Sequence, residues 1–410
     1  MALPMIRQLD AFPIDHDGRR FMCLRDPEGV VESQLLLTPQ AFFIACHLDG
    51  EHDVTDVQYL FARQFGGQLL GAADVQALVD TLDGHGFLYT ETFETIRRRI
   101  EMAFMEAEVR PAYFAGKSYP DQPEQLRAFL DATFDRHGGP GERPDAGARY
   151  GRPLRCLITP HIDFHRGGHA YAHGYLGLSK YAKPSTVFLF GVAHASPPVP
   201  FILTQKHFDT PFGVLETHQD IVQRLASVCT WEPYAYELVH RTEHSIEFQA
   251  VMLAYLYGPH VRIVPILCGF FGPEYATESA TIPDHVEAFL DVCRDVVAAA
   301  PQHMSVVAGA DLAHVGRRFG DAFDIDATVI QRVATRDHED LYHVTAGNAQ
   351  GFYRSVLKDR NQRRVCGLNC IYAALKTIEV DCSPDGRLLH YDYAHDPAGG
   401  IVSFANIVFP

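Results

Sequence analysis

The stretch LRCLITPHIDF, residues 154–164, joins a short apolar run to a histidine and an aspartate. Its apolar part lacks the alternation expected of a strand with one solvated face, so it indicates a strand buried on both sides. Three further runs of this kind follow, separated by helical patterns: STVFLFG (185–191), VRIVPILCG (261–269) and MSVVAGA (304–310). Apolar strands that alternate with helices predict an α/β domain with a mostly parallel central sheet covered by helices.

Three of these runs stop at a polar residue: His161, His194 and Asp311. Ligands of open α/β sheets bind outside the carboxyl ends of the strands, so we expect these side chains to share one crevice. His314 lies three positions after Asp311, and both side chains could face the same way on one helical turn. The alternative for Asp311 is a structural helix cap.

Histidines recur every fourth residue after the first strand: His161, His165, His169 and His173. The glycines at 167 and 168 should interrupt any helix that aligned all four. We therefore expect His161 to be a site residue at a strand end and His165 to lie in a loop. The last two should share a short helix, as helix-face residues bonded locally or to water.

The segment HRTEHSIEFQAVMLAYLY, residues 240–257, predicts a helix with Ser245 as its cap. His244 then lies near the positive end of the helix, which disfavours imidazolium and suits a neutral imidazole that accepts or relays a proton. Glu243 and Glu247 could belong to the site, or they could be ordinary acidic residues in the first turn of the helix.

Cys366 opens VCGLNCIYAALKTI. A thiol at a helix start should have a lowered pKa and be available as thiolate for metal binding or nucleophilic attack. The alternative is a small core residue, a description that fits Cys370 better.

Composition excludes several classes of protein. The 410 residues include 35 Lys+Arg against 51 Asp+Glu, a net charge of −16, and no basic stripe suited to nucleic acid. The first twenty residues lack a leader pattern and no apolar run is long enough to cross a membrane, so we expect a cytoplasmic protein. Nine cysteines without CxxC pairs indicate reduced thiols rather than a disulfide framework.

Residues 1–105 predict a separate domain: short strands, three helices, the piece FLYTET (87–92) as a wing strand, and a connecting helix near 92–107. This order resembles the small winged-helix domain of the PqqD-like family. The resemblance implies peptide docking by strand addition, with a regulatory or packing appendage as the alternative. Residues 106–410 then form the α/β domain.

Five motifs in the α/β domain occur in a characteristic order: TPHIDF, FGVAHA, TEHSIE, ADLAHVGRRF and VCGLNC. Together they resemble the MEMO family, also called AmmeMemoRadiSam system protein B, over residues 112–409. The resemblance implies a fold similar to class III extradiol ring-cleaving dioxygenases, which are non-haem iron enzymes.

By position, the family's two metal-binding histidines match His161 and His194, and its site cysteine matches Cys366. The resemblance further assigns site roles to three residues: His244, Asp311 and His314. The chain departs from the family where Asp163 replaces a common glycine, which could add a carboxylate near the site.

The resemblance implies a metal-dependent redox enzyme with iron, or alternatively copper or zinc. In this interpretation two histidines bind the metal and either Cys366 or Asp311 is the third ligand. His244 or His314 transfers protons. It also implies a radical SAM partner, with a peptide or protein held by the N-terminal domain. The alternatives are a non-catalytic peptide-binding adaptor and a zinc-dependent hydrolase.

Overall fold

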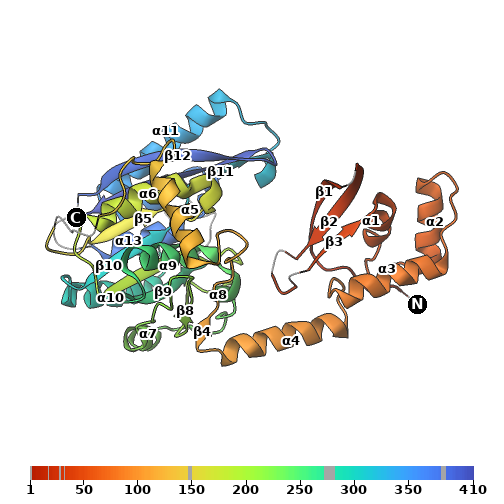
Figure 1. Ribbon diagram of the computed structural model, residues 1–410, viewed down its shortest axis with the longest axis horizontal. Coiled ribbons are helices and arrows are strands. Elements are labelled where there is room, and N and C mark those ends of the chain that lie inside the picture. Colours follow the sequence, from red (N-terminus) through yellow and green to blue (C-terminus); the bar gives the residue numbers. More distant parts are fainter. Residues whose placement is uncertain are drawn as a thin grey trace. The chain divides into compact units, whose positions relative to one another are not determined.

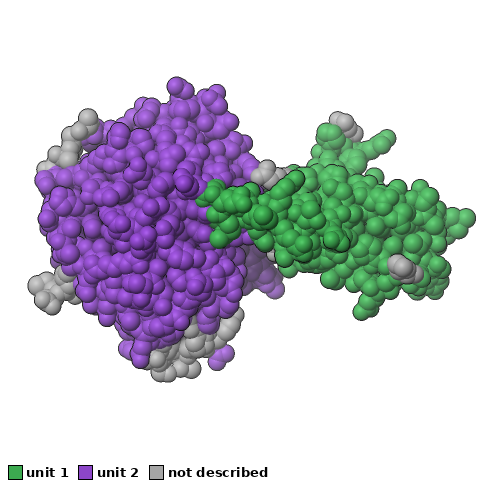
Figure 2. All heavy atoms as spheres, turned by 90° about the horizontal axis from the view of Figure 1, so that it is seen from below, with its two compact units in different colours: residues 1–107 green, residues 108–410 purple. Residues whose placement is uncertain are grey.

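The structure is a computed structural model of the chain (Figure 1) that describes all residues except 1, 17, 27–28, 32, 146–149, 272–281 and 380–384. The chain forms two compact units, Met1–Ala107 and Glu108–Pro410 (Figure 2). Among the described residues, no helix has both the length and the apolar character needed to cross a membrane.

In the first unit, the strands of an antiparallel sheet come first along the chain and the helices follow. The strands are ordered β1 (Asp10–His16), β2 (Arg19–Arg25) and β3 (Gln34–Leu37). The helices are α1 (Pro39–Ala45), α2 (Val54–Gln64), α3 (Ala72–Gly84) and α4 (Glu91–Glu106). Asp53 starts α2 by accepting hydrogen bonds from the backbone of Thr55 and Asp56, as a capping residue does.

The predicted wing strand at 87–92 is wrong. Leu88 forms only an isolated bridge with Ile6, and α4 already begins at Glu91. Tyr89 and Thr90 form a bend, and Glu91 and Thr92 already belong to α4, so the first unit is a small antiparallel sheet with helices. Its likeness to the PqqD-like domain stays a prediction.

The second unit is built on a central sheet with strand order β11-β13-β5-β10-β6-β9-β7 and β12 paired to β13. The strands are β5 (Cys156–Thr159), β6 (Thr186–Val192), β7 (Phe201–Leu203), β9 (Arg262–Cys268), β10 (Met304–Gly309), β11 (His314–Gly316), β12 (Arg387–Asp396) and β13 (Gly400–Phe409). A separate parallel pair consists of β4 (Val109–Arg110) and β8 (His207–Phe208).

This sheet is mixed, which corrects the prediction of a mostly parallel one. The ladders β5–β10, β10–β6 and β6–β9 are parallel, as the four apolar runs indicated. The outer ladders formed by β13, β11, β12 and β7 are antiparallel. The chain between β12 and β13 is a turn at 397–399, and a connection that short permits only an antiparallel pair.

Helices cover both faces of the sheet, as Figure 1 shows. They are α5 (Pro123–Asp135), α6 (Phe164–Ser179), α7 (Gln219–Ala226), α8 (Val239–Thr242), α9 (His244–Tyr257), α10 (Asp284–Ala299), α11 (Ala327–Thr345), α12 (Ala349–Leu357) and α13 (Leu368–Thr377). Successive residues of β6 point to opposite faces: Phe188 and Phe190 pack with α10, α12 and α13, whereas Val187 and Leu189 pack with α6 and α9. Burial on both faces explains why this strand is apolar throughout.

Helix α6 runs through the two glycines that were predicted to interrupt it. The Asp163 side chain accepts a hydrogen bond from the Arg166 backbone and starts the helix. A Cβ at Gly167 would lie 2.1 Å from Ile162 Cγ2, so glycine is needed here for close packing rather than for a helix break. His165 consequently lies in the first turn of α6 and not in a loop, and its ring packs edge-on against Phe129.

Candidate metal centre

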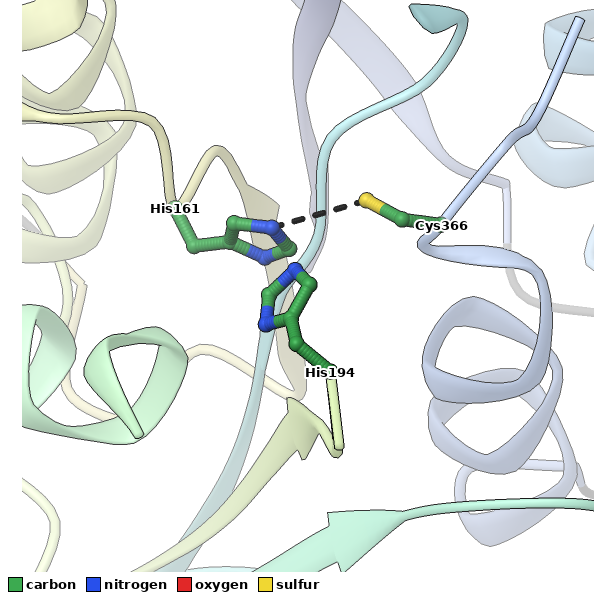
Figure 3. A group of neighbouring side chains, drawn as sticks. All are labelled: His161, His194 and Cys366. Carbon is green, nitrogen blue, oxygen red and sulfur yellow. Dashed lines mark hydrogen bonds between the residues drawn. The ribbon is translucent and has the colours of Figure 1, made fainter. Parts of the chain in front are cut away.

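Three side chains from separate elements meet at the carboxyl ends of the parallel strands. His161 follows β5, His194 follows β6, and Cys366 lies just before α13. One potential ligand atom of each lies within 4.8 Å of the others, and His161 Nε2 is 3.5 Å from Cys366 Sγ. Figure 3 shows the three side chains pointing toward one another. The strand-end argument brought His161 and His194 together, whereas Cys366 was singled out by its place at a helix start. The donor atoms of these three residues could bind one metal ion.

His161 is held in one orientation by the end of β10. Its Nδ1–H donates to the Gly309 carbonyl at 2.8 Å, and its backbone N–H donates to Asp311 Oδ1 at 3.0 Å. Because the carbonyl can only accept, Nδ1 carries the proton and the Nε2 lone pair faces Cys366. Burial lowers the pKa of His161 to about 3, with His194 acting in the same direction. The ring is therefore neutral at physiological pH, as a metal-binding imidazole must be.

His194 is backed by the buried carboxylate of Glu243. Its Nδ1–H donates to Glu243 Oε1 and Oε2, both at 3.0 Å, and its backbone N–H donates to Oε2 at 3.1 Å. Burial disfavours a charged His194 ring, but the Glu243 carboxylate outweighs burial and raises the pKa of His194 above its usual value. A metal ion at Nε2 would displace the proton that the raised pKa favours there, while the carboxylate keeps Nδ1–H in place and makes Nε2 a stronger ligand once that proton has left.

Glu243, rather than Ser245, is the cap of α9. Its side chain accepts the Ser245 backbone N–H at 3.0 Å, and α9 begins at His244. The Ser245 hydroxyl instead bonds the backbone of Val192 at the end of β6. Neither Glu243 nor Glu247 is an ordinary exposed first-turn acid, because both are buried and Glu247 pairs with the buried Arg110.

The Cys366 thiol does not have the lowered pKa that its place at a helix start predicted. Burial raises the pKa of Cys366, although the hydrogen bond with His194 acts in the opposite direction. The helix-start argument failed because the thiol is partly buried, and this burial disfavours thiolate more than the helix end favours it. A bound cation would supply the positive charge that stabilises thiolate here.

The other predicted site residues surround this cluster. The His244 ring stacks on His194 with a centroid separation of 4.8 Å, and burial lowers the pKa of His244 to about 3. Asp311 Oδ2 lies 3.6 Å from His161 Nε2, but its Oδ1 is engaged by the backbone. His314 begins β11, so the helical turn predicted for residues 311–314 is wrong. Its Nδ1 lies 3.1 Å from the Leu312 carbonyl.

A cavity of about 630 Å³ opens beside His194 and Cys366. Its lining includes every described non-glycine residue with a positive φ: Ser196 (47°), Arg360 (59°), Asn361 (53°) and Arg364 (53°). Backbone strain of this kind concentrates at functional sites, where the surrounding structure maintains it. Asn361 Oδ1 accepts the Val365 N–H at 2.7 Å and so helps hold the loop that leads to Cys366.

Sequence reasoning missed the strained loop at 360–364 and left the role of Glu243 open. The available signal for Glu243 was its position directly before a histidine at a helix start, but its pairing with His194 depends on a tertiary contact. Asp163, singled out as a departure from the family pattern, bonds Arg166 and caps α6. His165 does not belong to the cluster of donor atoms around His161.

Comparisons with known proteins find relatives over most of the chain. A protein-family model described as Memo-like protein matches residues 110–408. A MEMO1 family protein from Aquifex aeolicus is 26% identical over 407 residues, which cover 99% of this chain and 99% of that protein. Another, from Thermus thermophilus, is 30% identical over 316 residues, covering 75% of this chain and 85% of that protein.

The chain also has a distant likeness to a solved structure. An uncharacterized protein from Escherichia coli K12 gives a TM-score of 0.39 at 12% identity, covering 63% of this chain and 100% of that one. A likeness at this level carries no argument about function or fold.

Proposed function

This chain belongs to the Memo-like family, and from that premise we propose that it is a metal-dependent oxidoreductase whose metal ion is bound by His161, His194 and Cys366. The observation that carries the proposal is the convergence of two oriented imidazoles and one thiol beside a cavity. Each histidine uses Nδ1 for a protein hydrogen bond and leaves Nε2 for a ligand. This is the arrangement usual for metal-binding histidines.

The donor set fits a transition metal. Two nitrogens and one sulfur suit iron, copper or zinc and do not suit the oxygen-preferring magnesium or calcium. We propose iron, with copper as the nearest alternative, because the family resembles non-haem iron enzymes. When bound, such an ion supplies redox chemistry that amino acid side chains lack.

The protein's own groups then have distinct roles. Glu243 orients His194, and the Asp311 carboxylate holds the backbone at His161. His244 is our candidate for proton transfer, because its ring stacks on His194 and its Nδ1 lies 3.4 Å from Glu243 Oε1. The cavity admits the substrate, and its strained loop keeps Cys366 at the edge of the site.

Oxygen consumption tests the redox part of the proposal. Protein purified anaerobically and loaded with one equivalent of Fe(II) or Cu(I) is exposed to oxygen, and uptake is recorded together with peroxide formation. We expect protein-dependent uptake that is lost in His161→Ala and His194→Ala and retained in His165→Ala, the matched control from the same segment. Uptake that is unchanged in the first two variants contradicts the proposal. Hydrolytic turnover with zinc in the absence of oxygen would favour the hydrolase alternative.

The first unit suggests a second function, the binding of an extended peptide or of a partner protein such as a radical SAM enzyme. Among the described residues, β1 and β3 each pair on one side only, and such edges accept an added strand. Peptides selected from a display library on the full-length chain should protect the amides of 10–16 or 34–37 from hydrogen exchange. Protection confined to the second unit would exclude this mode of binding.

A further inference from the structure

A second cluster of donor atoms lies between α6 and β12, away from the carboxyl ends of the parallel strands. It consists of His169 on α6 and of His390 and Asp392 on β12, and one potential ligand atom of each lies within 4.8 Å of the others. We propose that these three residues form a second metal site, for a divalent transition-metal ion such as zinc. We call it the outer cluster, and His161, His194 and Cys366 the inner cluster.

The distances suit a shared ion. His169 Nε2 lies 3.0 Å from Asp392 Oδ2, and His390 Nε2 lies 3.9 Å from the same oxygen. Two ligands that each lie about 2.0–2.2 Å from one zinc ion are separated by roughly 3–4 Å. The same oxygen thus lies within the required separation of both ring nitrogens, and water could complete a four-coordinate ion.

One of the two ring nitrogens lacks a hydrogen-bond partner among the described residues. His390 Nε2 is buried and makes no hydrogen bond to any described residue. A buried polar nitrogen without a partner costs free energy, which a bound cation would recover. This observation points to a ligand independently of the clustering.

The fold brings both β12 residues to the α6 side. The register of β12 against β13 shifts between Leu388 and His390. Leu388 packs on one side of the sheet, whereas Leu389 packs on the other side with α6. The bulge therefore lets His390 follow Leu389 on the same face, and normal alternation then adds Asp392.

A neighbouring histidine holds one ring of the cluster in place. The His173 ring stacks on His390 at 4.2 Å with an interplanar angle of 11°, and His173 Nε2–H donates to the Gly138 carbonyl at 2.9 Å. These contacts fix the position of the His390 ring, so a cation would meet a side chain that is already oriented.

The decisive experiment uses the full chain with the inner cluster disabled by His161→Ala and Cys366→Ser. Binding of Zn²⁺ is measured by calorimetry, and Co²⁺ reports ligand geometry by visible absorption. We expect one equivalent of Zn²⁺ to bind. The affinity should fall more than about 100-fold in His390→Ala and in Asp392→Asn, beyond the loss typical of a residue outside the ligand set. His395→Ala, on the same strand but outside the cluster, is the matched control and should bind as its parent does.

Two outcomes overturn the proposal: Zn²⁺ affinity unchanged in both His390→Ala and Asp392→Asn, or no Zn²⁺ binding with the inner cluster disabled. Asp392→Asn keeps the size of the side chain, and circular dichroism of each variant shows that it is folded. His161 and Cys366 are replaced in every sample, and zinc held by the remaining group of His194, Glu243 and His244 would not respond to His390→Ala or Asp392→Asn. The result therefore does not depend on the proposed redox function.

Discussion

The inner and outer clusters contain similar donors but differ in how the fold supports them. The inner cluster joins segments at three strand or helix ends, has a buried carboxylate behind one histidine, and opens on a cavity. The outer cluster joins one helix to one bulged strand, and its carboxylate is itself a candidate ligand. The comparison teaches that donor residues alone do not define a role. The inner arrangement favours chemistry on a substrate, whereas the outer one favours a structural ion that ties α6 to β12.

Removal of an inner histidine should have the largest effect and should separate the two clusters. We expect His161→Ala to abolish iron or copper binding at the inner cluster, because one of its three donors is lost. Zinc binding at the outer cluster should persist. Elemental analysis of anaerobically purified protein measures both, and His165→Ala serves as the control. Loss of both ions together would mean that the clusters are not independent.

A change at Glu243 should weaken the inner cluster without removing a ligand. Glu243→Gln keeps the size of the side chain but removes the charge that orients His194. We expect a loss of inner-site affinity of about 10–100-fold, typical of residues behind a metal ligand. Competition with a chromophoric chelator gives the affinity. An unchanged value would show that the carboxylate behind His194 does not distinguish the inner cluster from the outer one.

Acid should destabilise the second unit because its buried imidazoles stay neutral. His240 is buried beside Phe208, and burial lowers its pKa to about 3. Between pH 6.5 and about 3, His240 is protonated in the unfolded chain but stays neutral in the folded chain. The free energy of unfolding therefore falls as the pH falls. One such group contributes at most about 1.4 kcal/mol per pH unit.

The single tryptophan, Trp231, lies in the second unit, so its fluorescence reports urea unfolding of that unit. In metal-free protein, His240→Gln should reduce the fall in the free energy of unfolding as the pH decreases. The exposed His395→Gln should leave this pH dependence unchanged. Equal slopes in wild type and His240→Gln would contradict a neutral buried imidazole.

The smallest effect is expected from the stacked ring beside the outer cluster. His173→Ala removes a parallel contact with His390 but no proposed ligand. A ring pair of this kind is worth about 0.5–1.5 kcal/mol, so outer-site zinc affinity should fall roughly two- to tenfold. Titration with Zn²⁺ in the inner-disabled background measures this. A loss as large as that of His390→Ala would make His173 a ligand and change the proposed donor set.

The sequence predicted the parts that follow from local pattern. Apolar runs located β5, β6, β9 and β10, and the polar residues at their ends located His161 and His194. The antiparallel edges were missed because they follow from the short turn between β12 and β13, which lies outside the apolar runs. Gly167 was misread because its role is packing against Ile162, a contact that sequence spacing does not show.

The outer cluster escaped prediction for a related reason. His169 and Asp392 are separated by 223 residues and meet only through the packing of α6 on a bulged strand. His169 and His173 were therefore interpreted as ordinary helix-face residues. The raised pKa of Cys366 was missed because its partial burial by tertiary structure outweighs the local effect of the helix start.

The most direct test of the central claim is X-ray absorption at the edge of the metal bound to the inner cluster. The sample is the Asp392→Asn chain, in which the outer cluster is disabled, loaded with one equivalent of iron or copper, and compared with the same chain carrying Cys366→Ser. We predict one sulfur neighbour together with imidazole nitrogens in the first sample, and loss of the sulfur signal in the second. A metal surrounded only by nitrogen and oxygen in the first sample would contradict ligation by His161, His194 and Cys366.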